Sequence, residues 1–131
     1  MSAFLPFELA DPVDGKTWKF VPFARKDGVF TYMETDESPT PELRPSVTIS
    51  TTMPSKTSKL MKVRAKLSYP CGKQLVENGP DVYSHTVSAD VTFLLPQISN
   101  VDQRSILLGM LKALLASSAP STAITHAEPI Y

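Results

Sequence analysis

Two alternating stretches joined by a polar loop lie in the middle of the chain, between residues 46 and 68. In residues 46–52 (SVTISTT) and 61–68 (MKVRAKLS), mostly apolar residues take every second position, and hydroxyl or basic residues lie between them. Because successive side chains of a strand point to opposite faces of a sheet, this period of two predicts two strands, each with one apolar and one polar face. Paired as a hairpin around residues 53–59, the strands would share one polar side.

That polar side would carry three cations in a row, Lys62, Arg64 and Lys66, beside the hydroxyl groups of the first strand. Such a row repels itself unless an anionic partner covers it, or unless water and salt screen it. The pattern therefore fits either a solvated sheet face or a platform that binds phosphates and base edges.

The distribution of charge favours the second interpretation. The chain has 13 basic and 13 acidic residues, so its formal net charge is zero, but the two signs are segregated. Residues 44–73 contain seven basic residues and no Asp or Glu, whereas residues 1–43 contain eight of the acidic residues. This segregation predicts a polyanion-binding face around the cationic row.

The length and composition exclude several other classes of protein. A chain of 131 residues is typical of one domain. We find no apolar run near the roughly 20 residues that a membrane span needs, and no signal peptide at the N-terminus, so no membrane partner is expected. The single cysteine, Cys71, excludes an intrachain disulfide framework and a zinc site with several cysteines.

Turn residues and alternation predict the remaining strands. Further strands are expected at residues 3–9, 17–23, 29–34 and 81–95. The first two form a hairpin, and Pro6 and Pro22 indicate that it lies at an edge or apart from the central sheet. Lys26-Asp27-Gly28 is typical of a turn, and residues 69–72 (YPCG) are expected to end their strand and to begin a loop that reaches Pro80.

The C-terminal part predicts two helices. Ser99 or Asn100 supplies an N-cap for a helix from residue 101 to about 117, and Pro120 suits the first turn of a short second helix through residue 127. The first helix carries a wide apolar stripe of Ile106, Leu107, Met110, Leu111, Leu114 and Leu115.

Strands followed by helices predict an α+β fold, with helices on one face of an antiparallel sheet. One helix and a shorter one cover such a sheet poorly. The uncovered apolar surface needs a partner, so we expect an obligate oligomer, most simply a homodimer that shares helices across its interface.

Catalytic and metal-binding motifs are missing from the sequence. It has no phosphate-binding loop of the G-x-x-x-x-G-K type, no G-x-G-x-x-G and no H-E-x-x-H. His85 and His126 lack metal-ligand neighbours at useful spacing, so His85 fits a core or interface position better than a metal site. No oxyanion-site context supports a Cys71–His85 catalytic pair. We therefore expect no enzyme activity, no cofactor and no small-molecule substrate.

Asp90 is the one carboxylate on the polar face of the strand expected at residues 81–95. It could accept hydrogen bonds from a base edge, or it could pair with Lys62 or Arg64. The sequence leaves both roles open.

From about residue 29 to residue 131 the chain resembles the coat proteins of leviviruses, the small single-stranded RNA bacteriophages. The resemblance is strongest in VTIS (47–50), MKVRAKL (61–67), SADVTF (88–93), the stretch from Gln97-Ile98-Ser99 to Arg104, LLAS (114–117) and Pro129-Ile130-Tyr131. SADVTF is closest to the Q-beta branch of that family.

The resemblance implies a single coat-protein domain over residues 1–131. It implies an N-terminal β-hairpin (1–24), a five-stranded antiparallel sheet (29–95) and two C-terminal helices (99–127). It also implies an intertwined dimer with a continuous ten-stranded sheet. The dimer interface would include the helix residues Leu107, Met110, Leu111 and Leu114.

The function implied is that of a major capsid protein, whose dimers build a T=3 icosahedral shell around the single-stranded RNA genome. The protein would occur in the virion capsid, and in the host bacterial cytoplasm during assembly. It would also bind an RNA hairpin, repress replicase translation and mark the genome for packaging. By position, the implied adenine-pocket residues are Val29, Thr48, Ser50, Lys62 and Arg64, the implied late-strand recognition residues are Ser88 and Asp90, and Lys66 completes the cationic row.

Two positions depart from the family pattern. Ser88 stands where the family has a tyrosine that stacks on a loop base, and Tyr83 is expected on the opposite strand face from Ser88 unless a bulge intervenes. The loop expected at residues 69–80 has one cysteine, whereas the Q-beta branch links subunits with two. The alternative function is a cellular dimeric RNA-binding regulatory protein that forms no shell.

Overall fold

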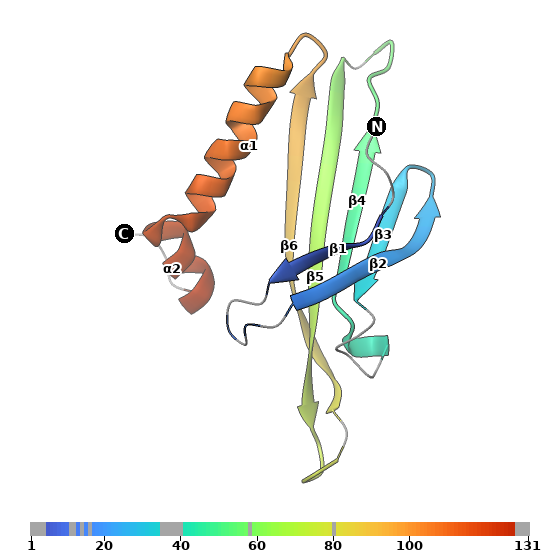
Figure 1. The fold of residues 1–131 in the computed structure, drawn as a ribbon, viewed down its shortest axis with the longest axis vertical. Coiled ribbons are helices and arrows are strands. Elements are labelled where there is room, and N and C mark those ends of the chain that lie inside the picture. Colours follow the sequence, from blue (N-terminus) through green and yellow to red (C-terminus); the bar gives the residue numbers. More distant parts are fainter. Residues whose placement is uncertain are drawn as a thin grey trace. The chain divides into compact units, whose positions relative to one another are not determined.

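The computed structural model describes residues 5–10, 13, 15, 17–34, 41–57, 59–79 and 81–127. In chain order its elements are β1 (Phe7–Ala10), β2 (Thr17–Lys26), β3 (Val29–Glu34), the short 3-10 helix η1 (Pro41–Leu43), β4 (Ser46–Thr52), β5 (Leu60–Gln74), β6 (Asp81–Pro96), α1 (Val101–Ala116) and α2 (Ser118–His126) (Figure 1). The chain divides into two compact units, Met1–Leu94 with the strands and Leu95–Tyr131 with the helices.

The strands form one six-stranded sheet in the order β1-β2-β3-β4-β5-β6. The expectation of a hairpin followed by a five-stranded sheet is therefore wrong in its strand count. The reason is the length of β2. Its first part, Thr17–Phe20, pairs antiparallel with β1, and its remainder, Phe20–Lys26, pairs antiparallel with β3. The N-terminal hairpin is thus continuous with the sheet.

Two prolines lie inside strands where the sequence predicts an edge or a strand end. Pro22 pairs with Tyr32 in the middle of β2, and β5 continues through Pro70 to Gln74. Pro22 lies beyond Phe20, the last residue of β2 that pairs with β1. Pro70 likewise lies beyond Ser68, the last residue of β5 that pairs with β4. A proline there need not remove a ladder hydrogen bond, because one side of its strand has no partner strand.

The turn between β2 and β3 matches its prediction. Lys26 pairs with Val29, and the two residues between them, Asp27 and Gly28, have φ of 52° and 79°. A two-residue hairpin turn of type I′ needs positive φ at both central positions, which Asp-Gly adopts readily. The turn that would join the two strands of the N-terminal hairpin lies largely outside the described residues.

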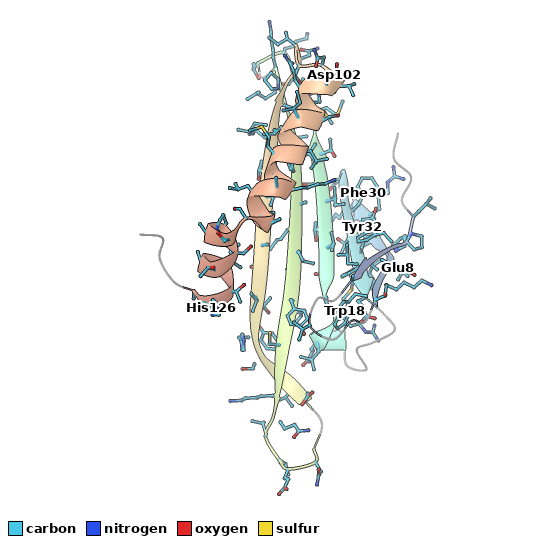
Figure 2. The ribbon with its side chains drawn as sticks, turned by 60° about the vertical axis from the view of Figure 1, so that its left-hand side comes forward. Glu8, Trp18, Phe30, Tyr32, Asp102 and His126 are labelled. Atoms are coloured by element: carbon cyan, nitrogen blue, oxygen red, sulfur yellow. The ribbon has the colours of Figure 1, made fainter. Side chains whose placement is uncertain are left out.

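The core of the sheet is aromatic and lies on the face opposite the cationic row. Phe20, Tyr32 and Val47 are buried, and Phe7, Trp18, Phe30 and Ile49 pack against them. The Phe7 ring lies 4.7 Å from that of Tyr32, edge to face. Figure 2 shows Trp18, Phe30 and Tyr32 on the first strands of the sheet.

The sheet is strongly curled. The ring centroids of Trp18 in β2 and Tyr69 in β5 are 6.2 Å apart, although β3 and β4 separate these strands in the sheet order. Figure 1 shows β1 and β2 running across the longer strands. The curl therefore places β1 and β2 over the apolar face of the sheet and buries the aromatic core.

The helical unit begins with Asn100 as the N-cap of α1, one of the two residues that the sequence left open. The Asn100 side chain accepts a hydrogen bond from the Gln103 N–H at 2.8 Å, and the Gln103 side chain accepts one from the Asn100 N–H at 3.1 Å. This capping box satisfies two N–H groups that the first turn would otherwise leave open. α2 carries Pro120 in its first turn, as expected.

No described helix is by itself long and apolar enough to cross a membrane, although α1 and α2, which are bent by 59° at their junction, meet the length and composition criteria together.

Candidate nucleic-acid interface

Strand register brings the predicted polar residues to one face of the sheet. In the β4–β5 pair, Thr48 lies opposite Lys66, Ser50 opposite Arg64 and Thr52 opposite Lys62. Residues directly opposite each other on antiparallel strands share a face. Because Val29 of β3 lies opposite Ser50, it belongs to the same face. Six of the predicted RNA-binding residues therefore lie together: Val29, Thr48, Ser50, Lys62, Arg64 and Lys66.

Asp90 of β6 also lies at this face of the sheet, because its carboxylate bonds to Arg64. The Arg64 Nε–H donates to Asp90 Oδ1 at 2.9 Å and to Oδ2 at 3.0 Å, and Arg64 Nη2 also bonds to Oδ2. Of the two roles left open for Asp90, the structure shows the ion pair, with Arg64 as its partner. Ser88 lies two residues earlier in β6, so strand alternation puts it on the same face as Asp90.

The ion pair stabilises the charged form of both groups. Hydrogen bonding to Asp90 raises the pKa of Arg64, and the negative charge of Asp90 acts in the same direction. Hydrogen bonding to Arg64 lowers the pKa of Asp90, as do the charges of Arg64 and Lys66, while desolvation opposes this shift. The side chains are 54% and 40% exposed, so the pair remains accessible from solvent.

Lys62 and Lys66 differ from Arg64 in this respect. Both are exposed, and neither has an ion-pair partner among the residues that the structure describes. The cationic row therefore consists of one cation already bonded to a carboxylate and two cations that face solvent. No local signal in the sequence could show this difference, because Arg64 and Asp90 are 26 residues apart.

Near Ser88, Tyr83 forms a side-chain hydrogen bond within β6. Its hydroxyl lies 2.8 Å from Thr86 Oγ1. Thr86 alternates with Ser88 and Asp90 along β6, so the Tyr83 hydroxyl bonds to a residue of the row that includes them. That Tyr83 itself lies on the opposite strand face from Ser88 stays a prediction.

The predicted interface residues of the first helix all lie on α1. Leu107, Met110 and Leu114 are 44%, 65% and 55% exposed in the single chain, and Leu111 is partly exposed. Their spacing puts them on one side of the helix. α1 thus presents a continuous apolar stripe, and none of its residues is buried.

In the part of the chain that the structure describes, no three His, Cys, Asp or Glu side chains lie close enough together to hold a metal ion. Cys71 Sγ lies 3.7 Å from the Tyr69 carbonyl oxygen, and His85 Nδ1 lies 3.2 Å from Ser84 Oγ. Both contacts are local, and no Cys71–His85 hydrogen bond is present among the described residues.

Comparison with known proteins identifies the family. Residues 8–131 match the family model described as levivirus coat protein. Over 91 residues, 70% of this chain and 68% of the relative, the sequence is 34% identical to the capsid protein of Qbeta virus (strain MX1).

Solved structures support the same fold. The virus-like particle of Beihai levi-like virus 21 contains a chain that matches with a TM-score of 0.87 at 21% identity, over 99% of each chain. The protein capsid of bacteriophage GA matches with a TM-score of 0.76 at 18% identity, over 98% of each chain. The curled antiparallel sheet followed by two helices is thus the fold of those coat proteins. The resemblance found in the sequence is confirmed: the chain belongs to the levivirus coat protein family, whose members are structural capsid proteins and not enzymes.

Proposed function

We propose that this capsid protein is the major coat protein of a small RNA bacteriophage, that the whole chain acts as one coat-protein domain, and that homodimers of it build a T=3 icosahedral shell around the single-stranded genome. The observation that carries the RNA-binding part is the hydroxyl-rich and basic face of β3, β4 and β5. The family assignment favours this role over that of a cellular regulatory dimer, which would form no shell.

The apolar stripe of α1 supports the dimer. Monomeric soluble proteins rarely leave a contiguous apolar surface of this kind exposed, and burial is worth roughly 25 cal/mol per Å² of apolar surface. A second copy of the chain, related by a two-fold axis, would cover Leu107, Met110, Leu111 and Leu114 with the same residues of its own helix.

The order of the strands supports a sheet that continues across the dimer. β6 has 16 residues and ends the order of the described strands, so one of its edges has no neighbour among them. An exposed strand edge offers N–H and C=O groups to a second strand. Two copies paired along β6 would join two six-stranded sheets, instead of forming the ten-stranded sheet implied by the resemblance.

The cationic face supports a role in RNA binding. Lys62 and Lys66 can neutralise phosphates, while the hydroxyls of Thr48 and Ser50 can bond to unpaired bases, with Val29 as an apolar neighbour. We propose that this face, with Arg64, Ser88 and Asp90, binds an RNA hairpin, represses replicase translation and selects the genome for packaging. Assembly would take place in the host bacterial cytoplasm.

Electron microscopy of the purified recombinant protein tests the proposal. We expect closed shells of uniform diameter that protect RNA from nuclease, and dimers as the smallest folded species after dissociation. Soluble dimers that never close into shells would support the cellular regulatory alternative. Shells that lack nuclease-protected RNA would contradict the RNA-binding part.

A further inference from the structure

One of the three cations on the proposed RNA face is already bonded within the chain. We propose that Asp90 is an internal counter-ion that withholds Arg64 from non-specific phosphate binding, so that Lys62 and Lys66 set the affinity for unstructured RNA and Arg64 serves selective recognition. This inference rests on the proposed RNA-binding function and names a specificity-determining pair within that site.

The geometry of the pair carries the first step. The Arg64 Nε–H lies 2.9 and 3.0 Å from the two Asp90 oxygens, and Nη2 bonds to the same carboxylate. The two opposite charges are thus separated by much less than the Debye length of about 8 Å at physiological salt. A phosphate that approaches this point of the sheet meets a charge of nearly zero, whereas at Lys62 it meets a positive charge without an ion-pair partner among the described residues. The charge of Asp90 also acts on Lys66, but the two residues form no ion pair.

The exposure of the pair carries the second step. Arg64 and Asp90 are 54% and 40% exposed, and ion pairs so exposed are individually weak. A ligand that offers better hydrogen bonds can therefore displace the carboxylate at little cost. Arg64 also retains N–H groups beyond those bonded to Asp90, because a guanidinium has five donors.

The ligand that can bond to both Arg64 and Asp90 is an unpaired base rather than a phosphate. The edge of a base carries donors and acceptors side by side, so it can accept from the guanidinium and donate to the carboxylate while both charges stay compensated. A phosphate has acceptor oxygens only and would face the repulsion of Asp90. The pair therefore lowers the affinity for any RNA backbone. It does not lower the affinity for RNA that presents a suitable unpaired base at this position.

A double-mutant cycle in assembled dimers tests the proposal. The variants are Asp90→Asn, which removes the charge and keeps the shape, Arg64→Gln and the double variant, with Lys66→Gln as the matched control. The probe is a single-stranded oligouridine, and the measurement is the slope of log affinity against log salt. Asp90→Ser provides a second way to remove the charge, and thermal unfolding confirms that each variant is folded.

We expect Lys66→Gln to reduce the magnitude of the slope by about 0.7, the value for one phosphate contact on a single strand. Asp90→Asn should increase it by about 0.7, because Arg64 can then contact a phosphate, and the double variant should return it to the parent value. Both Asp90 variants should tighten oligouridine binding.

Two results would overturn the inference. The first is a slope in Asp90→Asn that equals that of the parent, and the second is oligouridine affinity that is unchanged in both Asp90 variants. If the pair only holds β5 and β6 together, replacing Asp90 should lower the melting temperature and leave the contribution of Arg64 to the slope unaltered. Failure of the proposed RNA face is a different result, because the Lys66→Gln control would then also leave the slope unchanged.

Discussion

At the residue scale, the charge available to phosphates on the proposed RNA face comes from Lys62 and Lys66. Both are exposed residues of β5, alternate with apolar residues and lie opposite hydroxyl residues of β4. Arg64 lies between them and is held by Asp90. The distinction matters for mutagenesis, because removing Arg64 also leaves a carboxylate without its partner.

The double variant Lys62→Gln/Lys66→Gln should weaken RNA binding with a smaller salt dependence. Each phosphate that is no longer neutralised by a lysine should reduce the magnitude of the slope by about 0.7. Filter binding across a salt series, together with the RNA content of purified particles, checks this. Lys19→Gln removes an equal charge from β2 and is the control. A slope equal to that of the parent would mean that these lysines do not contact RNA.

Ser88→Tyr should tighten binding to a hairpin with an unpaired loop pyrimidine. Stacking of a base on an aromatic ring is worth about 1–3 kcal/mol, or about one to two decades of affinity. Ser88→Leu adds bulk without an aromatic ring and should give no such gain. Titration of the same hairpin at matched salt compares the variants. Equal affinities in Ser88→Tyr and the parent would place base recognition elsewhere.

At the element scale, the length of each strand relative to its neighbours decides the architecture. β2 exceeds β1 and so pairs with both β1 and β3, while β5 continues past the end of its pairing with β4. Curling of the sheet then brings Trp18 against Tyr69 and closes the aromatic core. Stability of the N-terminal strands should depend on that core.

Phe20→Ala should lower the free energy of unfolding by about 3–5 kcal/mol, because it removes a side chain that is 2% exposed from a packed core. Phe23→Ala is the matched control, since Phe23 lies in the same strand and is 67% exposed. Its effect should stay within about 0.5 kcal/mol. Denaturant unfolding of dissociated dimers measures both. Similar losses in the two variants would show that the core is elsewhere.

At the scale of the whole molecule, the single chain leaves its helical stripe exposed and is expected to associate. Leu111→Asp would put a charge into the proposed helix contact, which is costly unless that charge is paired. We expect this variant to give no dimers and no shells, as measured by light scattering after size exclusion. Lys112→Asp changes the neighbouring position and should still assemble. A folded monomer of the parent protein at micromolar concentration would contradict the dimer.

Covalent links between subunits should not be needed for particle integrity. The chain has one cysteine, so each subunit can form a single disulfide, which joins two subunits but cannot close a ring. Cys71 lies within β5, where its Sγ is near the Tyr69 carbonyl oxygen. We expect Cys71→Ser particles to survive mild heating as the parent does. Ladders larger than a pair on non-reducing gels would contradict this expectation.

Features set by neighbouring residues were predictable from the sequence alone. Alternation predicted β4 and β6 to within one residue at each end, and Asp27-Gly28 predicted the hairpin turn. Ser99 and Asn100 marked the start of α1, and the structure has Asn100 as the N-cap. Each depends on side-chain periodicity or on hydrogen bonds between residues within one turn, so local sequence suffices.

Features set by distant residues were decided only by the tertiary structure. The tolerance of β5 for Pro70 depends on where its pairing with β4 ends, and the ring contact between Trp18 and Tyr69 depends on the curl of the whole sheet. The bond between Arg64 and Asp90 spans 26 residues and needs the arrangement of β5 and β6. The sequence determined which residues share a face, because alternation is local, whereas strand register determined which of them meet.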